Sequence, residues 1–241
     1  MSGWKGPLIW IATAAIFAGG AYLADKHIPG EHLPWKELDT SRPLGKATKS
    51  QILRMALSPP EVCMDLARDT AGFETIPSDP KEGPSTGDGK DVCGWEVARL
   101  VYGQDDIVLT PGEANMKCPL SVSTYLWTRE IDRLAQERYG EGLAKMHHMG
   151  TYSCRRQNGN NSGRWSQHAY GNAWDVASFE LTDGHLVSVR SDWTGEDGDA
   201  EFLRDIRNAA CKVFNVTLSP DYNAAHYDHF HLDMGPSSAC R

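Results

Sequence analysis

The sequence has no surplus of positive charge. Its 241 residues include 24 lysines and arginines against 32 aspartates and glutamates, which gives a net charge of -8. A broad surface for nucleic acid or anionic lipid needs the opposite balance. We therefore expect no nucleic-acid partner. The sequence also shows no internal repeat, so a repeat architecture is not indicated.

Closely spaced cysteine pairs of the C-x-x-C type are absent, which argues against a zinc knuckle. The six cysteines are instead spread along the chain, at positions 63, 93, 118, 154, 211 and 240. An even, dispersed set is typical of disulfides in an oxidising compartment. Six cysteines allow 15 connectivities. Only Cys63 with Cys93, which flank the loop-like stretch 77–90, is locally plausible, and the other pairings stay open.

An uncharged run occupies residues 7–24, directly after Lys5. Its length suffices for a helix that crosses a bilayer, and its position is typical of an export signal or an anchor rather than a core helix. A small-residue cleavage site is weak, because only Gly19-Gly20-Ala21 approaches one. We therefore predict an uncleaved signal-anchor over residues 1–24 in the inner membrane, a Pro- and Gly-containing periplasmic linker over 25–49, and a folded domain over 50–241.

Hydrophobic spacing predicts the main elements of this domain. Helices are expected over 120–139 and 201–214, with shorter helical pieces over 51–57 and 61–68. Strands are expected within 97–109, with a turn at 103–106, in a hairpin 176–189 that turns at Asp183-Gly184, and over 229–234. The regular strand and helix alternation of a parallel doubly wound sheet is lacking. The predicted class is α+β, an antiparallel sheet with flanking helices, stabilised by disulfides.

Residues 163–179, GRWSQHAYGNAWDVASF, change from a polar loop to an apolar strand that contains Asp175. Aspartate is depleted in strand interiors. A carboxylate there is either exposed on an edge or held by a positive charge. Asp175 is therefore a candidate metal ligand.

The stretch HYDHFHLD, residues 226–233, contains a His-x-His pair. On a strand, His229 and His231 point to one face, whereas Asp228 points to the other. If the strand of Asp175 lies alongside and the preceding loop brings His168 over, two histidines and one carboxylate surround a single point on the sheet face. That set is typical of catalytic zinc, whose fourth position is open to water. Neither motif contains the cysteine that usually closes a structural site.

The remaining histidines are expected to be solvated, because they fall in predicted turns or in the linker. They are His27, His32, His147, His148 and His185.

The pattern Ser166-x-His168-x-x-Gly171-x-Ala173-x-Asp175, followed by His229-x-His231, resembles the zinc peptidase superfamily. This superfamily joins lysostaphin-type enzymes, D-Ala-D-Ala carboxypeptidases and the penicillin-insensitive murein endopeptidase. Over about residues 60–241 the chain more closely resembles bacterial proteins called extensin-like, through YSCR (152–155), SQHAYGNAWDVASF, FLRDIRNAAC and HYDHFHLDM.

The resemblance implies roles for individual residues. His168, Asp175 and His231 match the zinc ligands, and His229 matches the non-ligand histidine that handles protons. Arg155 resembles an arginine that holds a substrate carboxylate in the carboxypeptidases. The glutamate base of that branch is replaced here by Asp228, which is one methylene shorter. Asp228, His226, Arg155 and Ser166 are therefore supporting or substrate-contacting candidates.

These observations together predict a zinc-dependent peptidase that acts on the stem peptides of peptidoglycan, with D,D-endopeptidase-like cleavage of cross-links. The His-x-His pair favours this prediction over a D,D-carboxypeptidase of the same superfamily. A third possibility is a cell-wall binding or scaffold domain that keeps the metal site without turnover. The complete ligand set together with His229 argues for activity.

Overall fold

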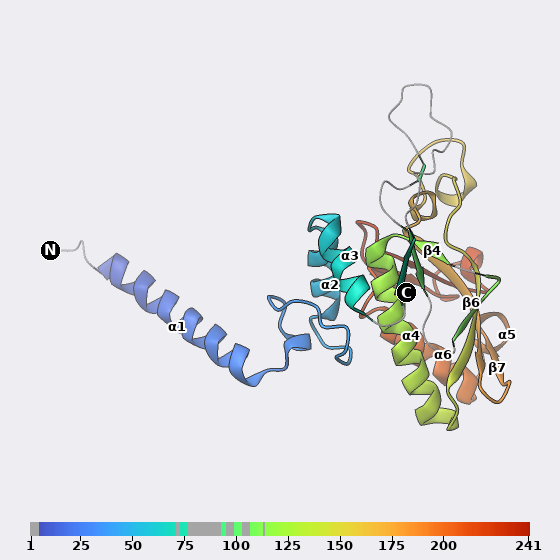
Figure 1. The fold of residues 1–241 in the computed structure, drawn as a ribbon, viewed down its shortest axis with the longest axis horizontal. Helices are drawn as coiled ribbons and strands as arrows, with labels where there is room; N and C mark the ends of the chain where they lie inside the picture. The colour runs from blue at the N-terminus through green and yellow to red at the C-terminus, as the bar shows by residue number, and fades with distance from the viewer. Residues whose placement is uncertain (1–4, 71–72, 77–92, 95–98, 103–106, 113) are drawn as a thin grey trace.

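The computed structural model describes residues 5–70, 73–76, 93–94, 99–102, 107–112 and 114–241. A seven-stranded sheet in the order β10-β8-β9-β6-β5-β3, with β7 also paired to β6, forms the centre of the domain (Figure 1). Its strands are β3 Val108–Thr110, β5 Leu143–Gly150, β6 Ala173–Leu181, β7 Leu186–Ser188, β8 Val216–Leu218, β9 Phe230–Asp233 and β10 Ala239–Cys240.

Most strand pairs of this sheet are antiparallel, as predicted, but β3 with β5 and β10 with β8 are parallel. The α+β class with flanking helices is confirmed, and the sheet is mixed rather than purely antiparallel. The predicted hairpin is present as β6 and β7. The predicted last strand is present as β9, although it begins at Phe230, one residue later than expected.

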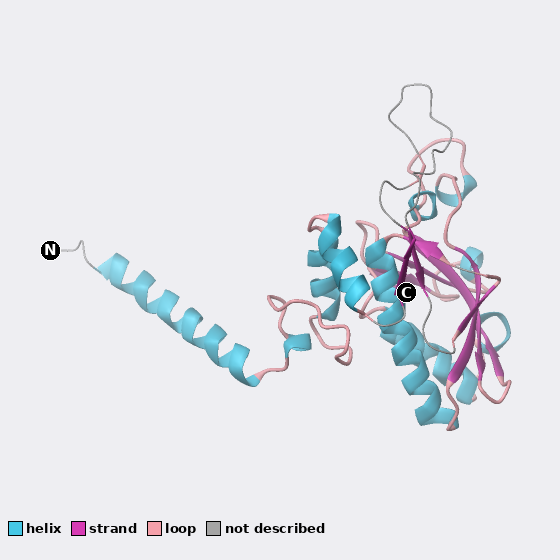
Figure 2. Cartoon of the chain, in the orientation of Figure 1, coloured by secondary structure: helices cyan, strands magenta, loops and turns pink. Residues whose placement is uncertain are grey.

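Two predicted helices, α4 (Cys118–Tyr139) and α6 (Gly198–Ala210), pack against each other beside the sheet (Figure 2). The short helix α5 (Val189–Asp192) also contacts α6. The indole of Trp127 on α4 is fully buried and makes edge contacts with the rings of Trp174, Phe179, Phe214 and Phe230. Its Nε1–H donates to the Ile206 carbonyl at 2.7 Å. The helices therefore cover one face of the sheet with an aromatic core.

Strand alternation decides which side chains face this core. Trp174 and Val176 of β6, and Phe230 and Leu232 of β9, are fully buried in the core. Asp175 and His231, which lie between them in sequence, must then point to the opposite face. One face of the sheet is therefore the apolar core face, and the opposite face carries the polar side chains of the candidate site.

A smaller sheet of three strands, in the order β1-β2-β4, lies against α3 (Pro60–Asp69) and α4. Its strands are β1 Phe73–Ile76, β2 Arg99–Tyr102 and β4 Asn115–Met116. The prediction that β2 and β3 form a hairpin is wrong, because β2 pairs with β1 and β4 while β3 pairs with β5. The predicted turn at 103–106 lies outside the described residues.

Three disulfides join Cys63 to Cys118, Cys93 to Cys154, and Cys211 to Cys240. The predicted pair of Cys63 with Cys93 is wrong. Cys63 on α3 faces the start of α4. Cys93 is bonded to Cys154 in the loop after β5, and the N–H of the next residue, Gly94, donates to the carbonyl of Ala169, which lies shortly before β6. Cys63 and Cys93 are consecutive cysteines in the sequence, but each is bonded to a more distant cysteine in the fold. The intervening stretch 77–90 lies outside the described residues.

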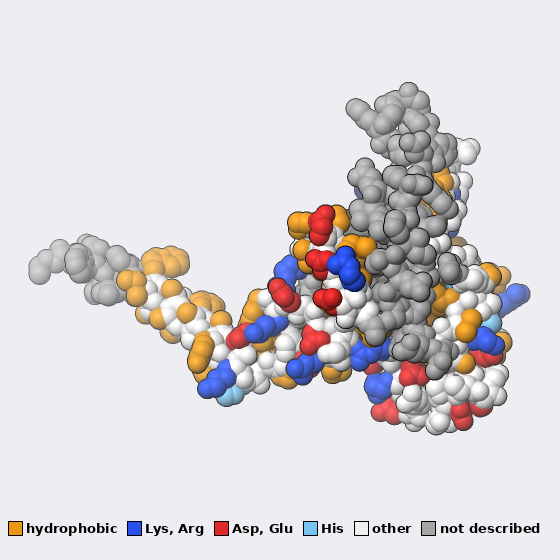
Figure 3. Space-filling view, viewed as in Figure 1, with side chains coloured by type: hydrophobic (Ala, Val, Ile, Leu, Met, Phe, Trp, Pro, Cys, Tyr) orange, Lys and Arg blue, Asp and Glu red, His pale blue; other side chains and the backbone are white. Residues whose placement is uncertain are grey.

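Helix α1 (Lys5–His27) projects away from the rest of the chain (Figure 1). Apolar side chains along it face solvent (Figure 3); they include Ile9, Trp10, Ile11, Ile16, Phe17, Tyr22 and Leu23. Among the described residues, the structure has no helix that combines the length and the apolar character of a membrane span. Residues 1–4 of the predicted anchor lie outside the described part.

The segment predicted as a linker, 25–49, contacts the domain from Gly30 onward. It contains the short helix η1 (Gly30–His32) and runs into α2 (Thr48–Ala56). Leu33 is buried, and the amide of Gln51 on α2 donates to the carbonyls of Gly30 and Leu33. Arg129 of α4 donates to the Thr40 carbonyl. Backbone groups of this segment therefore contact α2 and α4, which the sequence pattern for a tether does not reveal, and the domain division at residue 50 stays a prediction.

Candidate metal centre

His168 is held by a short helix, η3 (Gln167–Tyr170), directly before β6. Ser166 caps this helix, because its Oγ accepts the His168 N–H at 3.3 Å. Gly171 ends it with a positive φ of 60°, a conformation that glycine adopts without strain. The Ser153 N–H donates to the His168 carbonyl at 3.1 Å. Ser166 and Gly171 of the sequence motif therefore fix the backbone that presents His168.

Asp175 and His231 are brought together by strand register. Strands β6 and β9 are antiparallel, and Asp175 lies directly opposite His231. On the other side, Asp175 pairs with Gly150 at the end of β5. The predicted alignment of the two motif strands is confirmed.

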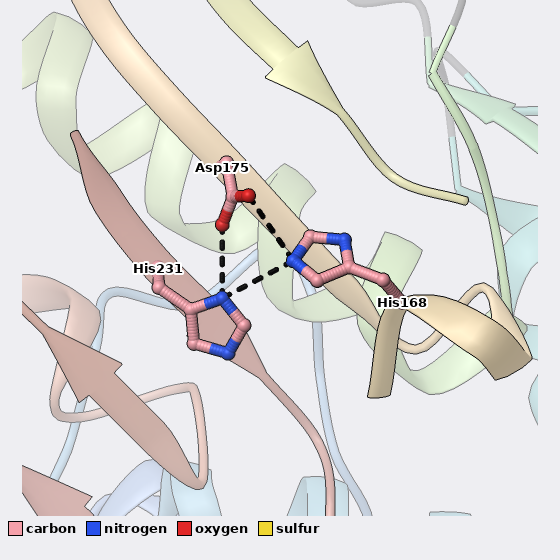
Figure 4. A group of neighbouring side chains, drawn as sticks. All are labelled: His168, Asp175 and His231. Atoms are coloured by element: carbon pink, nitrogen blue, oxygen red, sulfur yellow. Dashed lines mark hydrogen bonds and ion pairs between the residues drawn. The ribbon is translucent and has the colours of Figure 1, made fainter. Parts of the chain in front are cut away.

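The side chains of His168, Asp175 and His231 converge on one point (Figure 4). His168 Nε2 lies 3.1 Å from Asp175 Oδ2 and 3.3 Å from His231 Nδ1, and His231 Nδ1 lies 2.9 Å from Asp175 Oδ1. One potential ligand atom from each residue falls within 4.8 Å of the others. This group could hold a metal ion.

The outward nitrogen of each histidine in this group is bound to an oxygen acceptor. His168 Nδ1 lies 3.1 Å from the Thr151 carbonyl oxygen, and His231 Nε2 lies 3.1 Å from Asp233 Oδ2. Because these oxygens only accept, the outward nitrogens carry the protons. The inward nitrogens lie against the Asp175 carboxylate and are the ones that would offer lone pairs to a cation in place of a proton. Such outer contacts are the usual support of metal-binding histidines.

The protonation of the group without a metal follows from its burial and mutual contacts. Burial acts to raise the pKa of Asp175, but hydrogen bonds from His168 and His231 outweigh it and hold this pKa well below its ordinary value. Burial acts to lower the pKa of His231, whereas hydrogen bonds to Asp175 and Asp233 raise it to about 9. An ionised Asp175 carboxylate and a protonated His231 therefore lie against each other at the point where a cation would sit.

His229 borders the group without being part of it. Its Nε2 lies 3.7 Å from Asp175 Oδ1, and its Nδ1 lies 2.9 Å from Asp228 Oδ1. The expectation that Asp228 turns away from this region is wrong. Because β9 begins only at Phe230, residues 228 and 229 are free of strand alternation, and the Asp228 carboxylate reaches the His229 ring.

The other candidates lie around the group. His226, in η4 (Ala224–His226), stacks beside His229 with ring centroids 5.3 Å apart, and its Nδ1 is hydrogen-bonded to Asn223 Oδ1. Burial, with the nearby His231 and His229, lowers the pKa of His226 to about 4. Arg155 is exposed on the loop after β5, and its carbonyl accepts the Ser166 N–H. A role of Arg155 in substrate binding stays a prediction.

Sequence reasoning missed Asp233 and Thr151. Asp233 could have been found, because it lies two residues after His231 and so shares its face of the strand. The Thr151 contact uses a backbone carbonyl and leaves no signal in the sequence. The expectation that His148 is solvated is wrong: it is buried beside Trp174, its Nε2 lies 3.4 Å from the Gly112 carbonyl, and burial lowers its pKa.

The fold and the site together define an α+β domain with three disulfides and a two-histidine, one-carboxylate group on the face of a mixed sheet. The family described as "Extensin-like protein C-terminus" matches residues 68–241. The chain belongs to this family, and the match includes every residue of the candidate metal group. No curated protein and no solved structure matches the chain.

Proposed function

We propose that this domain is a zinc-dependent peptidase that hydrolyses peptide bonds in peptidoglycan. The observation that carries the proposal is the convergence of His168 Nε2, Asp175 and His231 Nδ1, with the opposite nitrogen of each histidine engaged by an oxygen. Two nitrogens and one carboxylate, three protein ligands that leave the fourth position of zinc to water, are the donor set of catalytic rather than structural zinc. Zinc bound there would act as a Lewis acid and lower the pKa of a bound water.

His229 is the residue that we propose handles protons in this reaction. Its Nδ1–H donates to Asp228, so its Nε2 is the free acceptor, and this atom lies 3.7 Å from the Asp175 carboxylate. A group in that position can take a proton from a water beside the ligands and return it to the leaving amine. The side chains of His229 and Asp228 are mostly buried, which favours a fixed geometry.

The proposed substrate class rests on the resemblance to the zinc peptidase superfamily and on the exported compartment that the disulfides indicate. The three disulfides are typical of an exported protein. Peptidoglycan stem peptides are an extracytoplasmic substrate, and Arg155, exposed on the loop that flanks η3, could contact one of their carboxylates. Attachment to the inner membrane through residues 1–24 stays a proposal, and fractionation of cells with and without these residues tests it.

The direct test is digestion of purified muropeptides by the full-length protein in mild detergent, with zinc added or removed by a chelator. Zinc-dependent conversion of a cross-linked dimer into monomers is the expected result. Loss of only a terminal residue from a pentapeptide monomer would instead identify a carboxypeptidase. A zinc-loaded protein that binds peptidoglycan but cuts neither substrate would contradict the peptidase proposal and favour the scaffold function.

A matched pair of variants ties the activity to the site. His168→Ala and His231→Ala should each lose zinc and activity, whereas His147→Ala, on the neighbouring strand β5 and paired with Glu180, should keep both. Elemental analysis gives the metal content. Stoichiometric zinc in a double variant that lacks His168 and His231 would refute the ligand assignment.

A further inference from the structure

Asp233 contacts the outward side of one candidate ligand. The Asp233 side chain is buried at the end of β9, and both of its oxygens are used as acceptors. Oδ2 accepts from His231 Nε2 at 3.1 Å, and Oδ1 accepts the Gly235 N–H at 2.7 Å. The carboxylate is therefore held from two sides.

We propose that Asp233 is a positioning residue that fixes His231 with Nδ1 as the metal-facing atom. The inference rests on the metal site of the proposed function, but not on peptide cleavage. A neutral imidazole has one N–H and one lone pair. Because Asp233 can only accept, it holds the N–H at Nε2. When a cation takes the place of the proton between His231 and Asp175, the lone pair is at Nδ1, on the side of His168 and Asp175. The negative charge of Asp233 also makes the imidazole a more basic ligand.

Close packing around Gly235, two residues after Asp233, restricts how this part of the chain can move. Gly235 approaches the chain that carries His168: a Cβ on Gly235 would lie 2.7 Å from Gln167 Cδ and 3.0 Å from Asp233 Oδ1. Gln167 is the first residue of η3. The turn after β9, whose Gly235 N–H is bound by Asp233, therefore packs against the segment that carries His168. Asp233 contacts His231 at Nε2 and not at the metal-facing Nδ1.

Asp233→Asn replaces one carboxylate oxygen of this side chain by an NH2 group. An asparagine has one acceptor oxygen and one NH2 group, so it cannot accept from both the Gly235 N–H and His231 Nε2–H. If the NH2 faces His231, Nε2 must accept and Nδ1 must carry the proton, which blocks the metal-facing atom. If the oxygen faces His231, the Gly235 contact is lost. In both cases the negative charge is removed.

Asp228→Asn is the matched control for metal affinity. Asp228 is also an aspartate, and its Oδ1 lies 2.9 Å from Nδ1 of the other histidine of the His-x-His pair. His229, however, is not a member of the candidate metal group. Both variants thus remove one negative charge from an aspartate that contacts a histidine of the His-x-His pair. In Asp233→Asn this histidine is the candidate ligand His231, and in Asp228→Asn it is His229, which lies beside the metal group.

The experiment measures zinc affinity of the full-length protein and both variants by competition with a chromophoric chelator, with the absorption spectrum of the cobalt-loaded forms as a second readout. We expect Asp233→Asn to weaken zinc binding by about 10- to 100-fold and to alter the cobalt spectrum, while Asp228→Asn leaves both unchanged. Wild-type affinity in Asp233→Asn, or an equal loss in Asp228→Asn, would overturn the role of Asp233.

Nitrogen NMR of the zinc-loaded wild-type protein gives a test that needs no variant, in case Asp233→Asn does not fold. We expect His231 to carry its proton on Nε2 and to bind zinc through Nδ1, and coordination through Nε2 would overturn the inference. The outcomes also separate this inference from the proposed function. Failure of the wild-type protein to bind zinc would contradict both, whereas zinc binding that depends on Asp233 without peptide cleavage would contradict only the peptidase.

Discussion

Trp174 and Asp175 are neighbours on β6, yet they belong to two different regions of the molecule. Trp174 is fully buried in the aromatic core under α4, whereas Asp175 joins His168 and His231 on the opposite face. The core face is held by many apolar contacts, none of which depends on one atom. The site face depends on a few polar atoms within about 3 Å of one another. We therefore expect variants on the two faces to fail in different ways.

The largest expected effect is on the core face. Trp127→Ala removes the ring that contacts Trp174, Phe179, Phe214 and Phe230 and leaves a large cavity. Substitutions of this kind lower the free energy of unfolding by about 3–5 kcal/mol. Chemical denaturation of the metal-free protein measures the loss, and metal binding should fail with the fold.

Trp35→Ala is the matched control, because Trp35 is about half exposed in the segment before α2. It should change the unfolding free energy by less than about 1 kcal/mol. If the two tryptophan variants unfolded at the same denaturant concentration, the core would not centre on Trp127.

On the site face, His229→Ala should leave both stability and zinc content near those of the wild type, because all three candidate ligands remain. Turnover of a cross-linked muropeptide should fall by about 10²- to 10⁴-fold, as expected for the loss of a general acid or base. Asp228→Asn should reduce turnover less, since it only orients His229. Normal turnover in His229→Ala with an inactive Asp228→Asn would instead make the carboxylate the proton acceptor.

The disulfides sharpen the comparison, because they lie in different regions. Cys93–Cys154 holds the loop whose Thr151 carbonyl and Ser153 N–H contact His168, whereas Cys211–Cys240 joins the end of α6 to β10. Replacing either pair by serines should lower the unfolding free energy by about 2–4 kcal/mol. Only loss of Cys93–Cys154 should also weaken zinc binding. Equal zinc affinity in the two double variants would show that this loop does not support the site.

The smallest expected effect lies at the turn between β6 and β7, away from both faces. A hydrogen bond to Asp199 raises the pKa of His185 above its unfolded value. A raised pKa means that the stabilisation is complete below the unfolded pKa, about 6.5, and disappears as the pH rises through the folded pKa. Because His185 is partly exposed, we expect less than about 1 kcal/mol.

Thermal unfolding of the wild type and His185→Ala across a pH series tests this prediction. The difference in Tm should be present at pH 5.5 and absent well above the raised pKa. A difference that grows with pH would mean that neutral His185 is the stabilising form.

Local patterns in the sequence were sufficient for much of the fold. The apolar spacing around Trp127 predicted α4, and Asp183-Gly184 predicted the β6–β7 hairpin. Strand alternation placed His231 on the face opposite Phe230, and Asp175 was recognised because a carboxylate inside a strand needs a partner. These features depend on residues close in sequence or on the two-residue period of a strand.

Contacts between distant segments could not be predicted in the same way. The disulfide partners of Cys63 and Cys93 and the parallel pairing of β3 with β5 depend on how whole elements pack. The contact of Asp228 with His229 depends on a strand that begins one residue later than its pattern suggested. The burial of His148 depends on Gly112 and Trp174, which are remote in sequence.

The position of β9 in the sheet limits when, during synthesis and folding, the three candidate ligands can come together. β9 is among the last strands along the chain, yet it lies between β8 and β6 and carries His231. A chain that emerges from its N-terminus can form α4 and the β5–β6 pair early, but it exposes two unpaired strand edges until β9 is inserted. An unfinished or clipped chain without β9 therefore presents only His168 and Asp175. A metal ion that needs His168, Asp175 and His231 together could then bind only after β9 has been inserted beside β6.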